Sequence, residues 1–454
     1  MPSHLNRRKF LKAVGTSAAT FTILQAGSAR TYAANEKLSI ACIGAGGRGA
    51  VNIRDTRSEN IVALCDVDFE RVADSFKNHD GLKIPNAKRY KDYRVMLSEM
   101  ESKIDAVIVS TPDHHHFHAS MAAIRLGKHV YCEKPLTHSI WEARELAKAA
   151  REAGVATQMG NQAQADKDTR LVQEFVMDNA IGPIREAHIW TDRPSRGLHG
   201  EYWPQGVPRP TDTPAVPAAF DWDLWIGPAP MRPYHPSYAP FKWRGWWDFG
   251  TGALGDMGCH YFDPVYRALK LKAPTSVEAV STRVNEESYP LGSVVTLHFP
   301  ARGEMPPVKV QWHDGGLRPP RPDALKEGNV MAANGVMLVG DHGVILTDWD
   351  HGWHMFPEDR AKEYGTPPEV LGRSPGHHEE WIRACKGGPK AGSNFDWAGP
   401  LTEGVLLGNV ALRSQLRDDL TQKKLNWDAD KMLFTNHEPA NQFLRREYRA
   451  GWQV

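Results

Sequence analysis

The chain has 454 residues, which is more than the ~150 of an average domain, so we expect two domains and short additional segments. Its 55 lysine and arginine residues nearly balance its 54 aspartate and glutamate residues, which leaves a net charge of +1. Such a chain lacks the basic excess that a phosphate backbone requires, which argues against nucleic acid as a partner.

The N-terminal segment has the pattern of an export signal. Residues 6–12 read Asn-Arg-Arg-Lys-Phe-Leu-Lys, which resembles the twin-arginine consensus, and small, mildly apolar residues follow as far as Ala34. We therefore expect residues 1–34 to be a signal read by the twin-arginine machinery, and the protein to be periplasmic or otherwise extracytoplasmic. The alternative is a disordered basic tail. A stable membrane span is not expected, because polar residues interrupt the ~18–20 apolar residues that a span needs.

Residues 35–160 alternate between short apolar runs and helical patterns, which predicts a Rossmann domain with a doubly wound parallel sheet. The strands are expected at Leu38–Ile43, Ile61–Cys65, Ala106–Ser110, His129–Cys132 and Val155–Gln158. The helices are expected at Glu70–Phe76, Tyr93–Met100, His118–Leu126 and Ile140–Ala153.

Residues 161–454 have a different pattern, which predicts a second, α+β domain with a large, mostly antiparallel open sheet. A helix near Thr169–Asn179 and a strand near Ile184–Trp190 come first, and a long Pro/Trp/Gly-rich stretch follows to Gly250. Further strands are expected at Ser276–Val284, Ser293–Phe299, Val308–Trp312, Gly335–Val339 and Val344–Leu346. Helices at His377–Cys385 and Gly399–Leu416 are expected to cover one face of this sheet.

The five cysteines are odd in number and have no paired spacing, so we expect buried thiols rather than disulfides. They are Cys42, Cys65, Cys132, Cys259 and Cys385.

A glycine motif follows the first expected strand. Gly44, Gly46 and Gly49 form G-x-G-x-x-G, which alone is weak evidence, but a strand precedes it and a second strand ends at Asp66 about twenty residues on. This context predicts a dinucleotide site in which Asp66 binds ribose hydroxyls and repels a 2′-phosphate, so NAD is preferred over NADP, although Arg71 could weaken that preference. The cofactor contacts expected here are Gly44, Gly46, Gly47, Arg48, Gly49, Asp66 and Arg71.

Three later segments, at residues 110–118, 131–136 and 252–263, carry a family resemblance. They read STPDHHHFH, YCEKPL and GALGDMGCHYFD, and together they resemble the Gfo/Idh/MocA oxidoreductases, which include glucose-fructose oxidoreductase and inositol dehydrogenase. The resemblance extends from Lys37 to the C-terminal region. It implies that Lys134 reaches the nicotinamide and the substrate hydroxyl, and that Asp256 and His260 act with it.

The spacing of Asp256, His260 and Asp263 places all three on one face if the segment is helical. Oxidation of a secondary alcohol needs a base for the hydroxyl proton, and His260 suits this role because imidazole titrates near working pH. Lys134 would polarise the alkoxide or relay the proton, and Asp256 would bind a substrate hydroxyl or orient the pair. A surface lysine, a helix N-terminal charge and a core histidine remain the structural alternatives for Lys134, Asp256 and His260.

The resemblance also implies cofactor contacts after the later strands of the first domain. They are Ser110, Thr111, Pro112, His116, Glu133, Lys134, Asn161 and Gln162. The histidines between His114 and His118 could suggest a metal site, but adjacent residues in one loop and helix start cannot all converge, so no metal is expected.

The tryptophan-rich run from Asp221 to Trp247 has two interpretations. It could form a wall against which a sugar stacks, with Trp247 as a substrate contact alongside Lys134, Asp256, His260 and Asp263. The stronger alternative is that these rings belong to the domain core or to an oligomer interface.

The resulting hypothesis is an NAD-dependent oxidoreductase that acts on a secondary hydroxyl of a sugar, glycoside or cyclitol. Free NAD is scarce outside the cytoplasm, so a tightly bound cofactor is expected. This favours a redox-neutral NAD-dependent glycosidase, lyase or epimerase as the main alternative, and a non-catalytic carbohydrate-binding protein as the second. A homo-oligomer, a dimer or tetramer, is expected from the resemblance.

Overall fold

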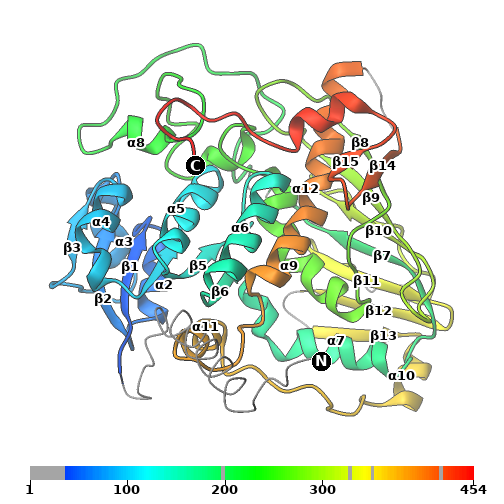
Figure 1. Ribbon diagram of the computed structural model, residues 1–454. Helices are drawn as coiled ribbons and strands as arrows, with labels where there is room; N and C mark the ends of the chain where they lie inside the picture. The colour runs from blue at the N-terminus through cyan, green and yellow to red at the C-terminus, as the bar shows by residue number, and fades with distance from the viewer. Residues whose placement is uncertain (1–35, 196–199, 326–329, 349–351, 419–422) are drawn as a thin grey trace, which may run out of the picture.

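The computed structural model describes residues 36–195, 200–325, 330–348, 352–418 and 423–454. These residues form two β-sheets with helices between and around them (Figure 1). The expected signal, residues 1–34, lies outside the described residues. In the described part of the chain, no helix combines the length and the apolar character needed to cross a membrane.

The first sheet has six described strands, all parallel, in the order β3-β2-β1-β4-β5-β6, which confirms the doubly wound fold. The five expected strands are present within two residues of their predicted limits. The short strand β3 was not predicted, because its exposed lysine and arginine show no apolar pattern. The strands are β1 (Ser39–Ile43), β2 (Asn60–Cys65), β3 (Lys88–Tyr90), β4 (Ala106–Val109), β5 (His129–Glu133) and β6 (Thr157–Gly160).

The helices of this domain are α2 (Arg48–Asp55), α3 (Phe69–Lys77), α4 (Tyr93–Met100), α5 (Asp113–Arg125) and α6 (Ile140–Ala153). Both α4 and α6 have the predicted limits. Ser139 and Glu142 form a reciprocal capping box that defines the start of α6. The prediction for α5 was wrong at its start, because the polar residues from Asp113 onward are helical and buried.

The second sheet has nine strands among the described residues, in the order β13-β12-β11-β7-β10-β9-β8-β14-β15. Its neighbouring strands are antiparallel except β7 and β10, as the prediction of a mostly antiparallel sheet requires. The strands are β7 (Ile184–Trp190), β8 (Ser276–Ser281), β9 (Ser293–Phe299), β10 (Val308–His313), β11 (Gly335–Gly340), β12 (Gly343–Asp348), β13 (Gly352–Phe356), β14 (Leu425–Asp428) and β15 (Leu433–Phe434).

Three helices fill the space between the sheets. α9 (Gly252–Ala268) and α12 (Phe395–Asp418) pack against each other, and α12 also packs on α6 of the first domain and on β8 (Figure 1). α7 (Lys167–Met177) packs on α9. The large shared core therefore continues from one domain into the other.

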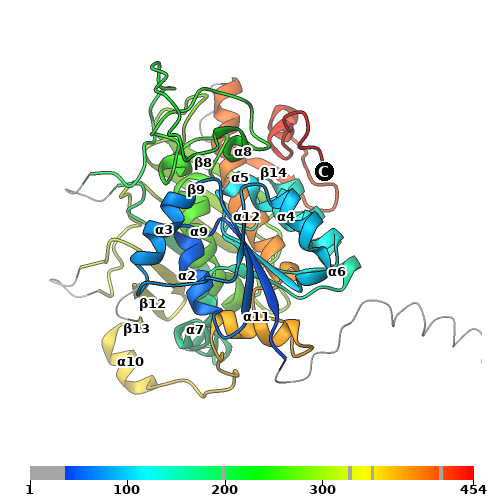
Figure 2. The ribbon, with the colours of Figure 1, turned by 90° about the vertical axis from the view of Figure 1, so that its left-hand side faces the viewer.

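The expected position of the helix at His377–Cys385 was wrong. This helix, α11, begins and ends as predicted, but it does not cover the second sheet. Its Trp381 packs with Ile40 and Tyr131 on the first sheet, beside which α11 lies in Figure 2. The buried side chains of α11 join those of α2 and α3 in the apolar cluster on one face of the first sheet.

The proline- and tryptophan-rich stretch extends from the second domain over the first (Figure 1). It contains α8 (Trp222–Ile226) and the 3₁₀ turn η4 (Lys242–Gly245). Trp222, Trp246 and Phe249 form a separate aromatic core within it. The backbone N–H of Asp221 donates to Val67 O at 3.1 Å, directly after β2, and so joins the stretch to the Rossmann sheet.

Candidate active site

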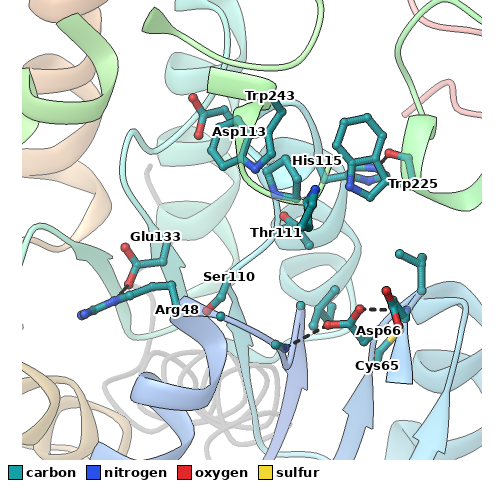
Figure 3. Close-up of a pocket in the computed structure, with 18 of the residues that line it drawn as sticks. Arg48, Cys65, Asp66, Ser110, Thr111, Asp113, His115, Glu133, Trp225 and Trp243 are labelled. Atoms are coloured by element: carbon teal, nitrogen blue, oxygen red, sulfur yellow. Dashed lines mark hydrogen bonds and ion pairs between the residues drawn. The ribbon is translucent and has the colours of Figure 1, made fainter. Parts of the chain in front are cut away.

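A cavity of about 430 Å³ lies at the carboxyl ends of β1, β2, β4 and β5, where the second domain meets the first (Figure 3). Ligand sites in open parallel sheets occupy this edge. The predicted site residues that line it are Gly44, Gly46, Gly47, Arg48, Asp66, Arg71, Ser110, Thr111, Pro112, Glu133, Lys134, Gln162 and His260. The fold thus brings together residues that are more than two hundred positions apart, from Gly44 to His260.

The glycine loop has a backbone that side chains would not permit. Gly44 has φ of +77°, and a Cβ there would lie 2.7 Å from Ser110 O. A Cβ on Gly49 would lie 1.8 Å from Gly44 O, so this glycine allows α2 to approach β1. No side chain caps the N-terminus of α2, although the N–H groups of Gly49 and Ala50 donate to Gly46 O and Gly47 O. The positive end of the helix dipole still faces the glycine loop and favours an anion there. This loop therefore fits a dinucleotide pyrophosphate.

The side chain of Asp66, directly after β2, is held by hydrogen bonds from the backbone, one of them from the glycine loop. Its carboxylate accepts the N–H of Gly46 at 2.9 Å and the N–H of Asp68 at 3.0 Å. Burial raises the pKa of Asp66, and these two hydrogen bonds and Arg71 act against that shift. Arg71 itself donates to Pro240 O at 3.0 Å, so it also joins the Rossmann domain to the second domain.

Glu133 is the centre of a polar cluster on the opposite wall (Figure 3). Its Oε1 accepts from Arg48 Nε at 3.0 Å, Asn52 Nδ2 at 3.0 Å and Gln162 Nε2 at 3.1 Å. Burial acts to raise the pKa of Glu133, but Arg48 and Asn52 lower it to about 2. The carboxylate is therefore charged and rigidly held at neutral pH, and it suits a binding role rather than proton transfer.

Lys134 and Asp256 form a buried ion pair. Lys134 Nζ donates to Asp256 Oδ1 at 2.8 Å and to Asp256 O at 2.6 Å, and Arg244 Nε donates to the same Oδ1 at 3.0 Å. Burial alone would raise the pKa of Asp256, but the two cations hold it well below its ordinary value. Asp256 does not itself line the cavity, so the geometry gives it the task of orienting Lys134.

His260 lies one turn after Asp256 on α9 and lines the cavity. Burial and the neighbouring Lys134 lower the pKa of His260 to about 3. The expectation that this imidazole titrates near working pH therefore needs correction, because it is surrounded by protein and lies next to a cation. The ring is therefore neutral at physiological pH, and burial makes it a weaker base than an ordinary histidine.

Two predicted substrate residues lie away from the cavity. Asp263 forms an ion pair with Arg267 at 2.7 Å and accepts from Trp397 Nε1 at 2.7 Å. Trp247 donates to Asn285 O at 2.9 Å and packs on the Tyr289 ring. Asp263 is on the expected helix face, but about two turns further along the axis than Asp256. Its partners, and those of Trp247, are structural, and we remove both residues from the substrate site.

Three predicted cofactor residues also do not line the cavity. Gly49 allows α2 to pack closely on β1. Asn161 is fully buried and donates to Cys259 O at 3.4 Å. The ring nitrogens of His116 face the carbonyl oxygens of Pro135 and Thr111. The other histidines near His116 lie in the first turns of α5. Among the described residues, no group of three His, Cys, Asp or Glu side chains is arranged to hold a metal ion. All five cysteines are buried and free, as predicted.

Sequence reasoning missed Arg244 and much of the rest of the cavity wall. We call residues 219–244 the cover segment, since several of them line the cavity. The wall residues outside the prediction include Tyr93, Phe220, Leu224, Phe241, Arg244 and Trp452, whereas Trp225 and Trp243 belong to the tryptophan-rich run that one interpretation placed in a sugar-facing wall. The density of tryptophan was the available signal, and it was interpreted as core or sugar-binding wall. Trp222 and Trp246 are core, whereas Trp225 and Trp243 face the cavity.

The cover segment is attached to the Rossmann domain and to the segment around Trp452. Lys91 Nζ donates to Ala219 O at 3.4 Å, and His115 Nε2 lies 2.8 Å from Trp225 O. Arg449 Nη1 pairs with Asp223 at 2.6 Å. Trp452 packs on the Arg94 guanidinium, whose carbon lies 4.2 Å from the ring centre. The cavity wall therefore combines the charges around Lys134 with aromatic rings such as Trp452. The Trp243 ring lies beside the first group, 4.2 Å from the guanidinium carbon of Arg244, which binds Asp256.

Two family models match the chain. Residues 38–161 match the NAD-binding Rossmann fold of the Gfo/Idh/MocA oxidoreductase family, and residues 201–294 match the C-terminal α/β domain of that family. A 1,5-anhydro-D-fructose reductase from Ensifer adhaerens is 42% identical over 87 residues, which are 19% of this chain and 26% of the relative. The scyllo-inositol 2-dehydrogenase (NADP(+)) of Bacillus subtilis is 23% identical over 185 residues, which are 41% of this chain and 40% of the relative.

The chain thus aligns with less than half the length of these curated relatives. Among solved structures, the WlbA dehydrogenase of Bordetella pertussis, in complex with NADH and UDP-GlcNAcA, has a TM-score of 0.56 at 17% identity. That match covers 87% of this chain and 100% of the other, and at this identity it shows the fold alone. The two family matches, the Rossmann topology and the glycine loop with Asp66 agree, and the chain belongs to the Gfo/Idh/MocA family of NAD-binding oxidoreductases.

Proposed function

We propose that this protein oxidises a secondary hydroxyl of a sugar, glycoside or cyclitol with NAD as the hydride acceptor. The observation that carries the proposal is that Lys134 and His260 line the same cavity as the glycine loop and Asp66. A proton acceptor and a cation are thereby available beside a dinucleotide site, which is what alcohol oxidation requires.

The residues have distinct tasks in this proposal. His260 is neutral and accepts the hydroxyl proton. Lys134 donates a hydrogen bond to the substrate oxygen as negative charge develops there, and Asp256 orients its ammonium group. Arg244 fixes Asp256 from the other side. Bound NAD would supply the hydride acceptor, as in other dehydrogenases.

The first test is a panel of sugars, glycosides and cyclitols incubated with the purified protein and NAD or NADP. NADH absorbance and product formation are both recorded. We expect at least one compound with a secondary hydroxyl to be oxidised, with NAD preferred because Asp66 repels a 2′-phosphate. Oxidation by neither cofactor, and no chemical change in any compound, would overturn the proposal.

The cover segment supports a tightly bound cofactor, since Trp225 and Trp243 line the same cavity as Asp66, as does Trp452. Such a cofactor favours the second candidate, a redox-neutral glycosidase, lyase or epimerase in which NAD is regenerated within each cycle. Denaturing the purified protein should release NAD(H). Its absence would contradict tight binding. Liberated sugar without net NADH would favour the second candidate, and net NADH without cleavage would eliminate it.

Export by the twin-arginine route and assembly as a homo-oligomer are part of the same proposal. Export is supported by residues 6–12, and a protein that carries a cofactor must leave the cytoplasm folded. Changing Arg7 and Arg8 together to lysine should retain the protein in the cytoplasm, as measured by cell fractionation. Light scattering of the purified protein should give a mass that is a multiple of the monomer mass. A monomer mass would refute assembly as a homo-oligomer.

A further inference from the structure

His116 lies between the two loops that form the floor of the cavity. The residue is only 1% exposed. Its Nδ1 lies 2.7 Å from Pro135 O, and its Nε2 lies 2.9 Å from Thr111 O. Thr111 follows β4 and Pro135 follows β5, and both Thr111 and Lys134 line the cavity. One ring therefore contacts the backbone of both loops at the Lys134 end of the site.

The two contacts restrict the protonation state of the ring. A carbonyl oxygen can only accept a hydrogen bond, and a neutral imidazole has one N–H and one lone pair. A neutral His116 would direct its lone pair at one of the two oxygens, which is unfavourable in a buried place. Only the imidazolium form donates to both oxygens at these distances.

The surroundings of His116 supply negative charge. Asp113, one turn earlier on α5, is 3% exposed and accepts a hydrogen bond from Thr251 Oγ1 at 2.6 Å. Burial lowers the pKa of His116, but the Cys132 sulfur, the Asp113 carboxylate and the Pro135 carbonyl raise it to about 10.

The other titratable groups around His116 are Cys132 on β5, His115 on α5, His138 before α6 and Lys134 after β5. The Cys132 thiol donates to Leu136 O at 3.7 Å. Burial lowers the pKa values of His115 and His138, so both are neutral at physiological pH. Lys134 is the remaining cation, and it is paired with Asp256. These neighbours of His116 therefore do not cancel the rise in the His116 pKa that the Asp113 carboxylate causes.

His114 provides a contrast within the same helix. Its two ring nitrogens also face carbonyl oxygens, at 3.2 Å from Phe249 O and 3.0 Å from Trp225 O. These oxygens already have other partners, namely the backbone N–H of His114 and the His115 ring. Burial, His115 and Arg446 lower the pKa of His114 well below its ordinary value. His114 is therefore neutral, so two facing carbonyl oxygens do not by themselves require an imidazolium. His116 differs in its shorter contacts, at 2.7 and 2.9 Å, and in its anionic neighbour.

We propose that His116 is a buried imidazolium that joins the Thr111 and Pro135 carbonyl groups and thereby positions Lys134 in the cavity. Asp113 is its counter-ion. Through Thr251, directly before α9, Asp113 also connects this group to the helix that carries Asp256 and His260. His116 is a positioning residue and makes no contact with the cofactor cavity. The protonation state is independent of the proposed function, while the kinetic consequence rests on it.

The direct test is nitrogen NMR of the full protein with labelled histidine rings at about pH 8, well above the ordinary histidine pKa. We expect one buried histidine with both ring nitrogens protonated, whose signal is absent from His116→Gln and retained in His114→Gln. His377 serves as a neutral reference, since its Nδ1 accepts from Gln164 Nε2 at 3.1 Å and its Nε2 donates to Met159 O at 2.9 Å. A His116 signal with one unprotonated nitrogen would overturn the proposal.

A second variant keeps the test independent of whether His116→Gln folds. Asp113→Asn removes the counter-ion and should lower the pH at which the His116 ring loses its second proton. This shift is followed in the same spectra, and an unchanged midpoint would refute the role of Asp113.

The kinetic test separates positioning from general destabilisation. His116→Gln should lower kcat about 10- to 100-fold, because small displacements of a reacting group have effects of this size. KM should change less than about threefold, because no binding group is removed. His114→Gln should retain the wild-type kcat. A loss confined to KM, or an equal loss in both variants, contradicts positioning. If the wild-type protein turns over no compound, the proposed function fails while the NMR result still decides the state of His116.

Discussion

Two parts of the cavity wall are built differently. Near Lys134, charged side chains restrain one another, and Asp256 binds both Lys134 and Arg244. The rest of the wall includes rings from the cover segment and Trp452, together with the charged Asp66 and Arg71. Charges that are fixed before a reaction stabilise new charge efficiently, whereas large apolar rings exclude water and slow dissociation. The charged group is therefore suited to chemistry, and the rings are suited to retaining a bound cofactor.

The substitution Lys134→Met should have the largest effect. Removing the ammonium group should lower kcat/KM about 10²- to 10⁴-fold, because the developing charge on the substrate oxygen loses its partner. The NAD(H) released on denaturation should not change. Steady-state kinetics and cofactor content are measured on the same preparation. The exposed Lys148 on α6 provides the control Lys148→Met. Unchanged turnover in Lys134→Met would favour a non-catalytic binding protein.

The substitution Asp66→Asn tests the role of Asp66. It keeps the size of the side chain but removes the charge that repels a 2′-phosphate, so affinity for NADP relative to NAD should rise about 10- to 100-fold. Fluorescence titration with both dinucleotides gives the ratio. The turnover number with saturating NAD should fall far less than in Lys134→Met. An equal loss of affinity for both cofactors would show that Asp66 acts only by holding the loop.

The substitution Trp452→Ala should speed cofactor loss about tenfold, since a ring stacked in such a wall contributes roughly 1–3 kcal/mol. Retained NAD(H) is measured during prolonged dialysis. Trp353 on β13 is half-buried and distant from the cavity, so Trp353→Ala is the matched control. Similar retention in both variants would contradict a role of the rings in retaining the cofactor.

The pH dependence should show the smallest change. Because burial and Lys134 lower the pKa of His260 to about 3, the ring binds a proton only in strong acid. Above that range it is neutral, so kcat/KM should show no ionisation near the ordinary histidine pKa of about 6.5. A bend at that pH in the wild-type profile, absent from His260→Gln, would contradict this assignment.

Local patterns predicted the first sheet and the glycine loop, because strand alternation and glycine geometry depend on neighbouring residues. The same patterns did not predict the parts of the site whose side-chain partners come from distant segments of the chain. Helical spacing placed Asp263 on the correct face, but could not tell that Arg267 and Trp397 meet it there. Arg244 was missed because its partner, Asp256, becomes its neighbour only after η4 and α9 pack together. The aromatic residues of the cover segment do not recur at a regular spacing, so the sequence cannot tell which rings lie in the core and which line the cavity.

The walls of the cavity come from segments far apart in the sequence, from Gly44 to Trp452. The glycine loop alone is half of a binding site, because the opposing rings arrive only when the second domain has folded around the first. Cofactor affinity is therefore coupled to completion of the fold, and bound cofactor in turn stabilises the completed state. Loss of the rings or of the glycine loop should therefore weaken the same binding equilibrium.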